Sequence, residues 1–274
     1  MLQTWRITPT QNLKLETDAS TLDDITRRLP EGYYSTFRTF DAGTRVLGLA
    51  AHLRRLYEPV RAPEVDEQTL RRELRTLLES YRPHEARIRA VMTRQGQVYL
   101  VIASLVPLPT EIYEKGVHVE TTALRREHPR LKSTSFIGRS DSERKYLAQE
   151  GIFEALLVKE GKILEGMTSN FFYVVRRDAI PPYLGTARAG ILPGVTRETV
   201  LMIAQGRGVD VNYKPLQLNQ LAEIDEAFIT SSSRGIVPVV QIDQIAIGQG
   251  SPGPVTQDLM AAYGSYVSEN AEKI

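Results

Sequence analysis

One lysine of this 274-residue chain stands in surroundings that suit covalent chemistry. Other lysines, such as Lys159 and Lys162, occupy plainly polar turn sequences. Lys132 instead follows Leu131 and precedes the small and apolar residues 133–137, at the end of an irregular segment. Partial burial of a lysine favours its neutral amine, which is nucleophilic towards an aldehyde. The alternative interpretation of Lys132 is an ordinary surface charge.

A glutamate further along the chain complements this amine. Glu165 ends an expected strand and is followed by Gly166 and the polar residues 168–170. This pattern predicts that the carboxylate points into a site lined by loops. A carboxylate can keep a pyridine nitrogen protonated, so that the ring acts as an electron sink. The alternative is a β-bend with a solvated glutamate.

Two further segments suit an anion. Pro193-Gly194 precedes an expected helix, and Gly194 lets a ligand approach the backbone closely. The first amides of such a helix attract a phosphate. The donor-rich turn 230–235 (TSSSRG) can hold a phosphate or a carboxylate. The alternatives are a plain helix entry with Thr196 near its cap, and an ordinary turn.

Composition excludes several other functions. The chain has no cysteine and a formal net charge of +1, with basic residues scattered along it. Thiolate catalysis and cysteine-bound metals are therefore excluded, and nucleic acid is not an expected partner. No apolar run approaches the roughly 20 residues that span a bilayer, and no signal peptide is recognisable. We therefore expect a cytoplasmic protein that has no membrane partner and no metal site. The histidines show neither triad nor metal spacing: His52, His84, His118 and His128.

Hydrophobic periodicity predicts the elements that position these residues. A leucine stripe predicts an amphipathic helix over 65–81, and Gln95-Gly96 predicts a hairpin turn. Ser140 with Glu143 forms a capping-box pattern for a helix ending at Gly151. Two further helices are expected over 52–57 and 195–205. The strands are expected over 33–40, 86–93, 98–105, 117–124, 153–158, 162–164, 170–175, 228–231 and 237–242.

The best candidate boundary between domains is the segment 106–110, because its two prolines at alternate positions oppose both helix and central strand. We therefore expect an α/β (α+β) protein with two domains. Residues 1–107 would form a small α/β domain, and residues 108–274 a larger domain rich in strands.

Taken together, the lysine, the glutamate, the helix entry and the serine-rich turn resemble the fold-type-IV pyridoxal-phosphate enzymes. This family includes branched-chain aminotransferases, D-amino-acid aminotransferases and 4-amino-4-deoxychorismate lyases. The resemblance extends from about residue 33 to 263, and the segment 154–172 is its most specific part. It implies pyridoxal 5′-phosphate as cofactor and a site at the interface of two α/β domains, usually completed by a second subunit in a homodimer.

The resemblance also assigns roles to individual residues. Lys132 matches the lysine that binds the cofactor covalently, and Glu165 matches the residue that bonds the pyridine nitrogen; these two are the expected catalytic residues. Further cofactor contacts are implied for Arg55, Arg125, Thr168, Ser169, Val195, Thr196, Ser231 and Ser232. Substrate contacts are implied for Tyr34, Arg89, Ser233 and Arg234.

Some family motifs differ in this chain. The Arg-x-His carboxylate trap of D-amino-acid aminotransferases is not evident after residues 94–96. The Gly-Thr-Ala triplet of branched-chain aminotransferases is replaced by Ser231–Ser233, and their Phe-Glu-Gly segment reads Tyr34-Ser35-Thr36. The segments 105–109 and 232–235 look more like lyase members. Substrate specificity is therefore not fixed by the motifs.

The expected function is reversible transfer of an amino group between an α-amino acid, of branched-chain or D-amino-acid type, and a 2-oxo acid. Arg89 and Arg234 each offer a guanidinium to a carboxylate, so they predict either a dicarboxylic substrate or another task for one of them. The alternative enzyme is a 4-amino-4-deoxychorismate lyase that releases pyruvate and 4-aminobenzoate. A non-catalytic interaction protein would be favoured had Lys132 or Glu165 been lost.

Overall fold

The computed structural model describes residues 2–177 and 180–274. These residues group into two compact units, and neither unit is continuous in sequence. The first contains residues up to Pro107, with Leu131–Arg139 and Tyr266–Ile274. The second contains Leu108–Arg130 and Ser140–Ser265. The segment with Lys132 therefore packs with the first unit, although a stretch of the second unit precedes it.

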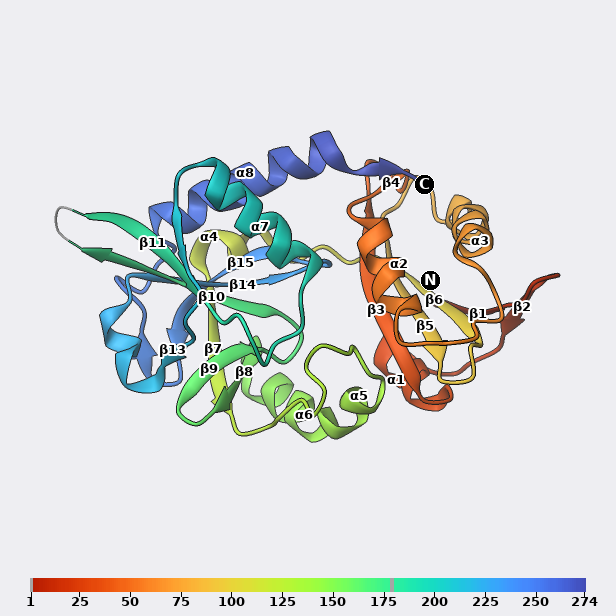
Figure 1. Cartoon of the computed structure of the whole chain (residues 1–274), viewed down its shortest axis with the longest axis horizontal. Helices are drawn as coiled ribbons and strands as arrows, with labels where there is room; N and C mark the ends of the chain where they lie inside the picture. The colour runs from red at the N-terminus through yellow and green to blue at the C-terminus, as the bar shows by residue number, and fades with distance from the viewer. Residues whose placement is uncertain (1, 178–179) are drawn as a thin grey trace. The chain divides into compact units, whose positions relative to one another are not determined.

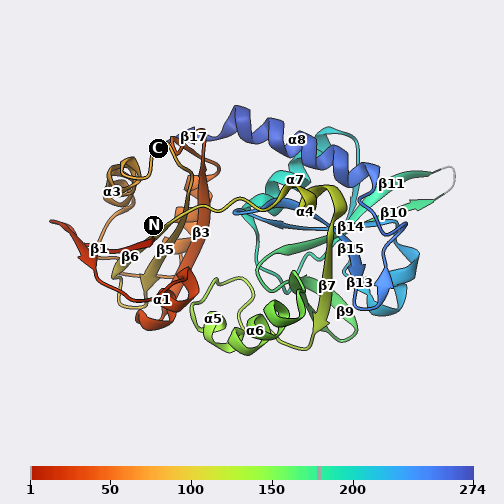
Figure 2. The ribbon, with the colours of Figure 1, turned by 180° about the vertical axis from the view of Figure 1, so that it is seen from behind.

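The first unit is built on a seven-stranded sheet in the order β17-β4-β3-β5-β6-β1-β2. Figure 2 shows β3, β5, β6 and β1 side by side in this sheet. The predicted hairpin is confirmed, since β5 and β6 pair antiparallel and Gly96 adopts φ 92° between them. The strands are β1 (Leu2–Ile7), β2 (Asn12–Leu15), β3 (Gly32–Phe40), β4 (Arg45–Val46), β5 (Ala86–Thr93), β6 (Val98–Ser104) and β17 (Glu272–Lys273).

Helices bury their apolar stripes in the core of this unit. In α3 the predicted stripe is confirmed, because Leu70, Leu74 and Leu78 are buried. Asp66 caps this helix by accepting the Thr69 amide at 2.7 Å. Helix α2 contacts β3, and Figure 1 shows it against that strand. The helices of this unit are α1 (Leu22–Arg28), α2 (Leu49–Tyr57), α3 (Glu67–Glu79) and α5 (Ser135–Arg139).

The second unit contains a ten-stranded sheet, part of which closes on itself. Its path runs β10-β14-β15-β7-β8-β9, and β9 pairs again with β10 through Glu165 and Asn170. The candidate catalytic glutamate is therefore one residue of the closing pair. The strands are β7 (Val117–Thr122), β8 (Glu154–Lys159), β9 (Lys162–Gly166), β10 (Asn170–Arg177), β11 (Ile180–Thr186), β12 (Asp210–Asn212), β13 (Leu216–Gln217), β14 (Glu226–Ser231), β15 (Gly235–Ile242) and β16 (Ile245–Ala246).

The helices of the second unit include the predicted helix after Pro193-Gly194. The predicted capping box at Ser140 is wrong: the helix begins there, but the Ser140 side chain makes no cap and accepts from Arg144 Nε at 3.1 Å instead. The elements are α4 (Thr110–Lys115), α6 (Asp141–Glu150), α7 (Val195–Gly206), a 3₁₀ helix (Leu218–Glu223) and α8 (Pro254–Asn270), whose end belongs to the first unit.

The mixed α/β architecture and the expected central strands are confirmed. Elements without clear hydrophobic periodicity were not predicted from the sequence, including β1, β2 and α1 near the N-terminus and α8 near the C-terminus. Across the described parts of the chain, none of the helices has both the length and the apolar character that crossing a membrane demands.

Candidate active site

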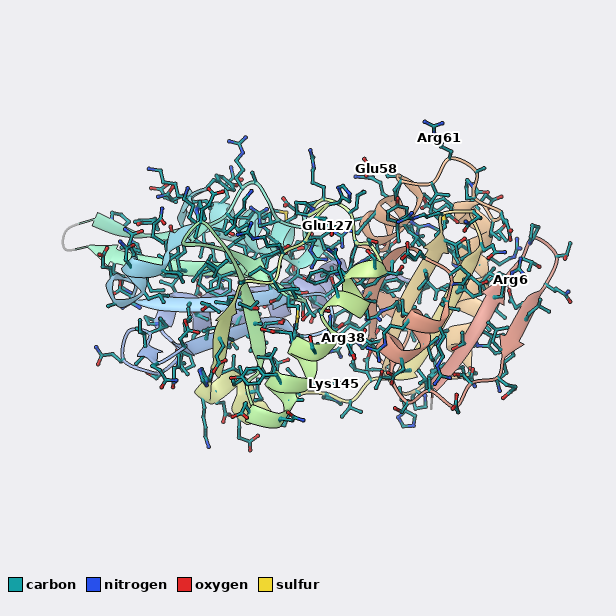
Figure 3. All side chains as sticks on the ribbon, turned by 90° about the horizontal axis from the view of Figure 1, so that it is seen from below. Arg6, Arg38, Glu58, Arg61, Glu127 and Lys145 are labelled. Carbon is teal, nitrogen blue, oxygen red and sulfur yellow. The ribbon has the colours of Figure 1, made fainter. Side chains whose placement is uncertain are left out.

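The backbone of β3 positions Lys132. The Tyr34 amide donates to the Lys132 carbonyl at 2.9 Å, and the Thr134 amide donates to the Gly32 carbonyl at 2.9 Å. The Lys132 amine lies 5.0 Å from the centre of the Tyr34 ring, and the lysine is half-buried. By contrast, Lys145, labelled in Figure 3, is exposed and pairs with Asp141 at 2.9 Å. Lys132 thus has the partly desolvated setting that the sequence suggested.

A buried histidine connects this lysine with Arg55. The His52 ring is buried, lies 4.9 Å from the Phe37 ring, and its Nδ1 is 2.8 Å from the Ser35 hydroxyl oxygen. Burial lowers the pKa of His52 well below its usual value, and the charges of Arg55 and Lys132 lower it further. Both cations therefore lie near one neutral ring in the first unit.

Arg89 is held by groups of its own unit. Its Nη1 donates to Asp23 Oδ1 at 2.5 Å and to Thr26 Oγ1 at 3.1 Å, and its Nε donates to Thr36 Oγ1 at 3.1 Å. The guanidinium also lies 4.8 Å from the Tyr34 ring centre. This arrangement favours a role in positioning Tyr34 over the expected contact with a substrate carboxylate, because the Asp23 charge offsets that of Arg89.

Glu165 is a buried carboxylate of the second unit, only 1% exposed, and it accepts several hydrogen bonds. Its Oε1 accepts from Arg126 Nε at 3.1 Å. Its Oε2 accepts from the Leu192 amide at 2.9 Å and from Asn170 Nδ2 at 3.4 Å. Charge-assisted hydrogen bonds of this kind keep a carboxylate ionised and fixed in direction. The Leu192 contact joins it to the loop that begins α7.

The start of α7 is open to an anion. Its N-cap is Gly194, which has no side chain to cap the first amides at Val195 and Thr196. A Cβ on Gly194 would lie 2.0 Å from Asn170 Oδ1, so no larger residue fits without a shift. The buried Thr196 hydroxyl donates to Ser232 Oγ at 3.4 Å. Two predicted phosphate contacts are thus adjacent in the second unit.

Three other predicted residues form a separate cluster around Glu154. The cluster joins Thr168 and Ser169 of the loop after β9 to Arg234 of the turn after β14. All three side chains donate to the same oxygen of Glu154, so the predicted substrate arginine already has a carboxylate partner. Ser231 accepts from Arg234 Nε at 3.1 Å. Ser233 lies half-buried in the same turn.

Three residues of this site, Arg126, Glu154 and Asn170, were given no role from the sequence. Arg125 is exposed, whereas Arg126 carries the guanidinium that contacts Glu165. The segment before Lys132 is irregular, so no period indicated which neighbour faces inwards. Asn170 and Glu154 stand in the family-like segment 154–172 but were given no task. A polar residue at the buried end of a strand was the available signal for both.

In each unit, the donors suit a part of pyridoxal phosphate by their chemistry. Lys132 supplies a partly buried amine, and Glu165 supplies a buried carboxylate for a ring nitrogen. The uncapped start of α7, with Thr196 and Ser232, supplies amides and hydroxyls for a phosphate. Arg55 adds a cation in the first unit.

Comparisons with known proteins identify the family of the chain. A sequence model described as amino-transferase class IV matches residues 32–242. The D-alanine aminotransferase of Bacillus licheniformis is 28% identical over 272 residues, covering 92% of this chain and 94% of that protein. The branched-chain-amino-acid aminotransferase of Pseudomonas aeruginosa is 27% identical over 270 residues, covering 88% and 85%. The crystal structure of a branched-chain aminotransferase from Thermoproteus uzoniensis with norvaline superposes with a TM-score of 0.76 at 23% identity, covering 99% and 98% of the chains, and shows the shared fold.

Proposed function

Since the chain belongs to the class IV aminotransferase family, we propose that its substrates are an α-amino acid of branched-chain or D type and a 2-oxo acid. The chain is a pyridoxal-phosphate-dependent transaminase, and the resemblance to fold-type-IV enzymes is confirmed. The relatives named above do not favour the lyase alternative, because both curated ones are aminotransferases.

The observation that carries the assignment of the site is the bond between Glu165 and the Leu192 amide. This hydrogen bond holds the carboxylate that would contact the ring nitrogen against the loop before α7, the helix whose first amides would bind the phosphate. Pyridoxal phosphate, when bound, supplies an electron sink for the electrons released at the substrate's Cα. Glu165 would hold the proton at the ring nitrogen, and Arg126 would hold Glu165 ionised in its direction.

The remaining roles follow from position. Lys132 would bind the cofactor covalently and, once released by the substrate, would move the proton to and from the substrate's Cα. Arg55, Ser232 and the amides at Val195 and Thr196 would bind the phosphate. Tyr34 and Ser233 would contact the substrate. Each of these residues is present with the donor or acceptor that its role requires.

We also propose that the enzyme is a cytoplasmic homodimer that acts on small molecules, with neither nucleic acid nor membrane as a partner. This proposal rests on the family resemblance and on the scattered charge of the chain.

The test is a spectrum followed by a panel of amino donors. Protein purified with pyridoxal phosphate should be yellow, and borohydride should fix the cofactor to Lys132, as a mass increase of the peptide with that residue. Lys132→Ala should lose both signals, whereas Lys145→Ala should keep them. Conversion of bound pyridoxal to pyridoxamine phosphate by branched-chain or D-amino acids supports the function. Cleavage of aminodeoxychorismate without any such conversion would support the lyase instead.

A further inference from the structure

Glu154 gathers three donors on a single oxygen. It begins β8 and is 2% exposed. Its Oε2 accepts from Thr168 Oγ1 at 2.5 Å, from Ser169 Oγ at 3.2 Å and from Arg234 Nη2 at 3.0 Å. The same Nη2 donates to Thr168 Oγ1 at 2.7 Å. The arginine and the glutamate therefore form one compact hydrogen-bonded cluster with no net charge.

The cluster stands beside the residues assigned to the cofactor. Thr168 lies three positions after Glu165, and Arg234 lies two positions after Ser232. Ser232 Oγ in turn lies 3.4 Å from Thr196 Oγ1 at the start of α7. The loop after β9 and the turn after β14 are thus tied together by Glu154 next to the proposed phosphate contacts.

The side chain of Arg234 is held by contacts within its own unit. Its Nε donates to Ser231 Oγ at 3.1 Å, and its guanidinium lies 5.1 Å from the centre of the Phe153 ring. Its carbonyl accepts from the Tyr113 hydroxyl at 2.9 Å. The side chain is 21% exposed, so a ligand can still approach it. The attraction of Arg234 for a second carboxylate is reduced by the adjacent Glu154 charge, because the electric fields of the two opposite charges oppose each other at short range.

Resting on the proposed aminotransferase function, we propose that Glu154 is a specificity-determining residue: by neutralising Arg234 it favours amino donors with uncharged side chains over dicarboxylic donors. Glu154 need not touch the substrate for this effect. The proposal gives Arg234 a task other than binding the substrate's α-carboxylate. It also explains why an arginine can stand in this turn of an enzyme that acts on aliphatic donors.

The test compares the ratio of kcat/KM for glutamate to kcat/KM for leucine, with both enantiomers of each. Glu154→Gln keeps the shape and removes the charge, so Arg234 is left uncompensated and the ratio should rise roughly tenfold, the scale of one hydrogen bond to a charged group. Arg234→Gln leaves the glutamate uncompensated and should lower the ratio. The double variant Glu154→Gln/Arg234→Gln removes both charges and should restore the wild-type ratio.

Glu226 provides a matched control at the opposite end of β14. It is 3% exposed, pairs with Arg176 and accepts from the Thr256 amide at 2.7 Å, away from the cluster. Glu226→Gln should leave the ratio unchanged, even if the midpoint of thermal unfolding falls. Unfolding midpoints and the pyridoxal phosphate dissociation constant of every variant provide readouts independent of turnover.

Two results would overturn the proposal. One is a Glu154→Gln enzyme that loses activity equally with both donors, which indicates a purely structural role. The other is a double variant whose ratio lies well below that of the wild type, which indicates that Arg234 binds the second carboxylate despite Glu154. The double variant keeps the proposal testable if Glu154→Gln does not fold. A wild-type protein that converts neither donor would instead contradict the proposed function.

Discussion

Replacing Gly194 by alanine tests whether the start of α7 and Glu165 form one unit. Gly194 has φ −73° and ψ 137°, so alanine is not strained by the backbone conformation. The obstacle is space, because the new Cβ would lie 2.0 Å from Asn170 Oδ1 and 3.2 Å from its Cγ. Asn170 is only 4% exposed, and its amide donates to the Leu192 carbonyl at 2.8 Å and to Glu165.

The expected cost follows from these bonds. Displacing Asn170 breaks its hydrogen bond to the Leu192 carbonyl and its longer hydrogen bond to the charged Glu165. If the partners stay buried, the two losses together lower the free energy of unfolding by about 2–4 kcal/mol. For a chain of this size each kcal/mol lowers the midpoint of thermal unfolding by roughly 2–4 °C. We therefore expect the midpoint of the apoprotein to fall by about 4–16 °C. The dissociation constant of pyridoxal phosphate should rise by about tenfold or more, because the loop that carries the first amides moves.

The assay is thermal unfolding followed by circular dichroism, together with a titration of the apoprotein with pyridoxal phosphate. Gly206→Ala is the matched control at the other end of the same helix, where an added Cβ has no atom within 4 Å. That variant should be neutral or more stable by about 0.4–1 kcal/mol. If the two variants show the same midpoint and the same affinity, the proposed connection between Asn170, α7 and Glu165 is wrong.

Three further predictions concern the chemistry, the stability and the assembly. Glu165→Gln should lower turnover by orders of magnitude while most of the cofactor is retained, because the phosphate contacts dominate binding; an unchanged rate would refute the role at the ring nitrogen. Burial keeps His52 neutral in the folded protein while the unfolded chain takes up a proton below about pH 6.5, so stability is lost as the pH falls. Denaturant titrations of the wild type and His52→Gln should show that the variant loses roughly 2 kcal/mol less between pH 7 and pH 5, and parallel curves would contradict this. Sedimentation should show a homodimer, and an active monomer at micromolar concentration would exclude that assembly.

Elements whose signals are local could be predicted from the amino-acid sequence. The leucine stripe of α3, the glycine turn between β5 and β6 and the entry to α7 each depend on residues within one or two turns of each other. Lys132 and Glu165 could be singled out in the same way, from unusual residue types next to small or polar neighbours. The residues with which they interact lie far away in the chain and leave no local trace.

Those partners are set by the packing of segments that lie far apart in the chain. The Lys132 carbonyl accepts from Tyr34, 98 positions earlier, and Glu165 accepts from Leu192, 27 positions later. The contact of Arg126 with Glu165 depends on which way a side chain points in an irregular segment, and such a segment has no period that can be extrapolated. The pairing of Arg89 with Asp23, and of Arg234 with Glu154, depends on how separate elements pack. The sequence therefore indicated which chemical groups are present, while packing determined which arginines already have a carboxylate partner inside the protein.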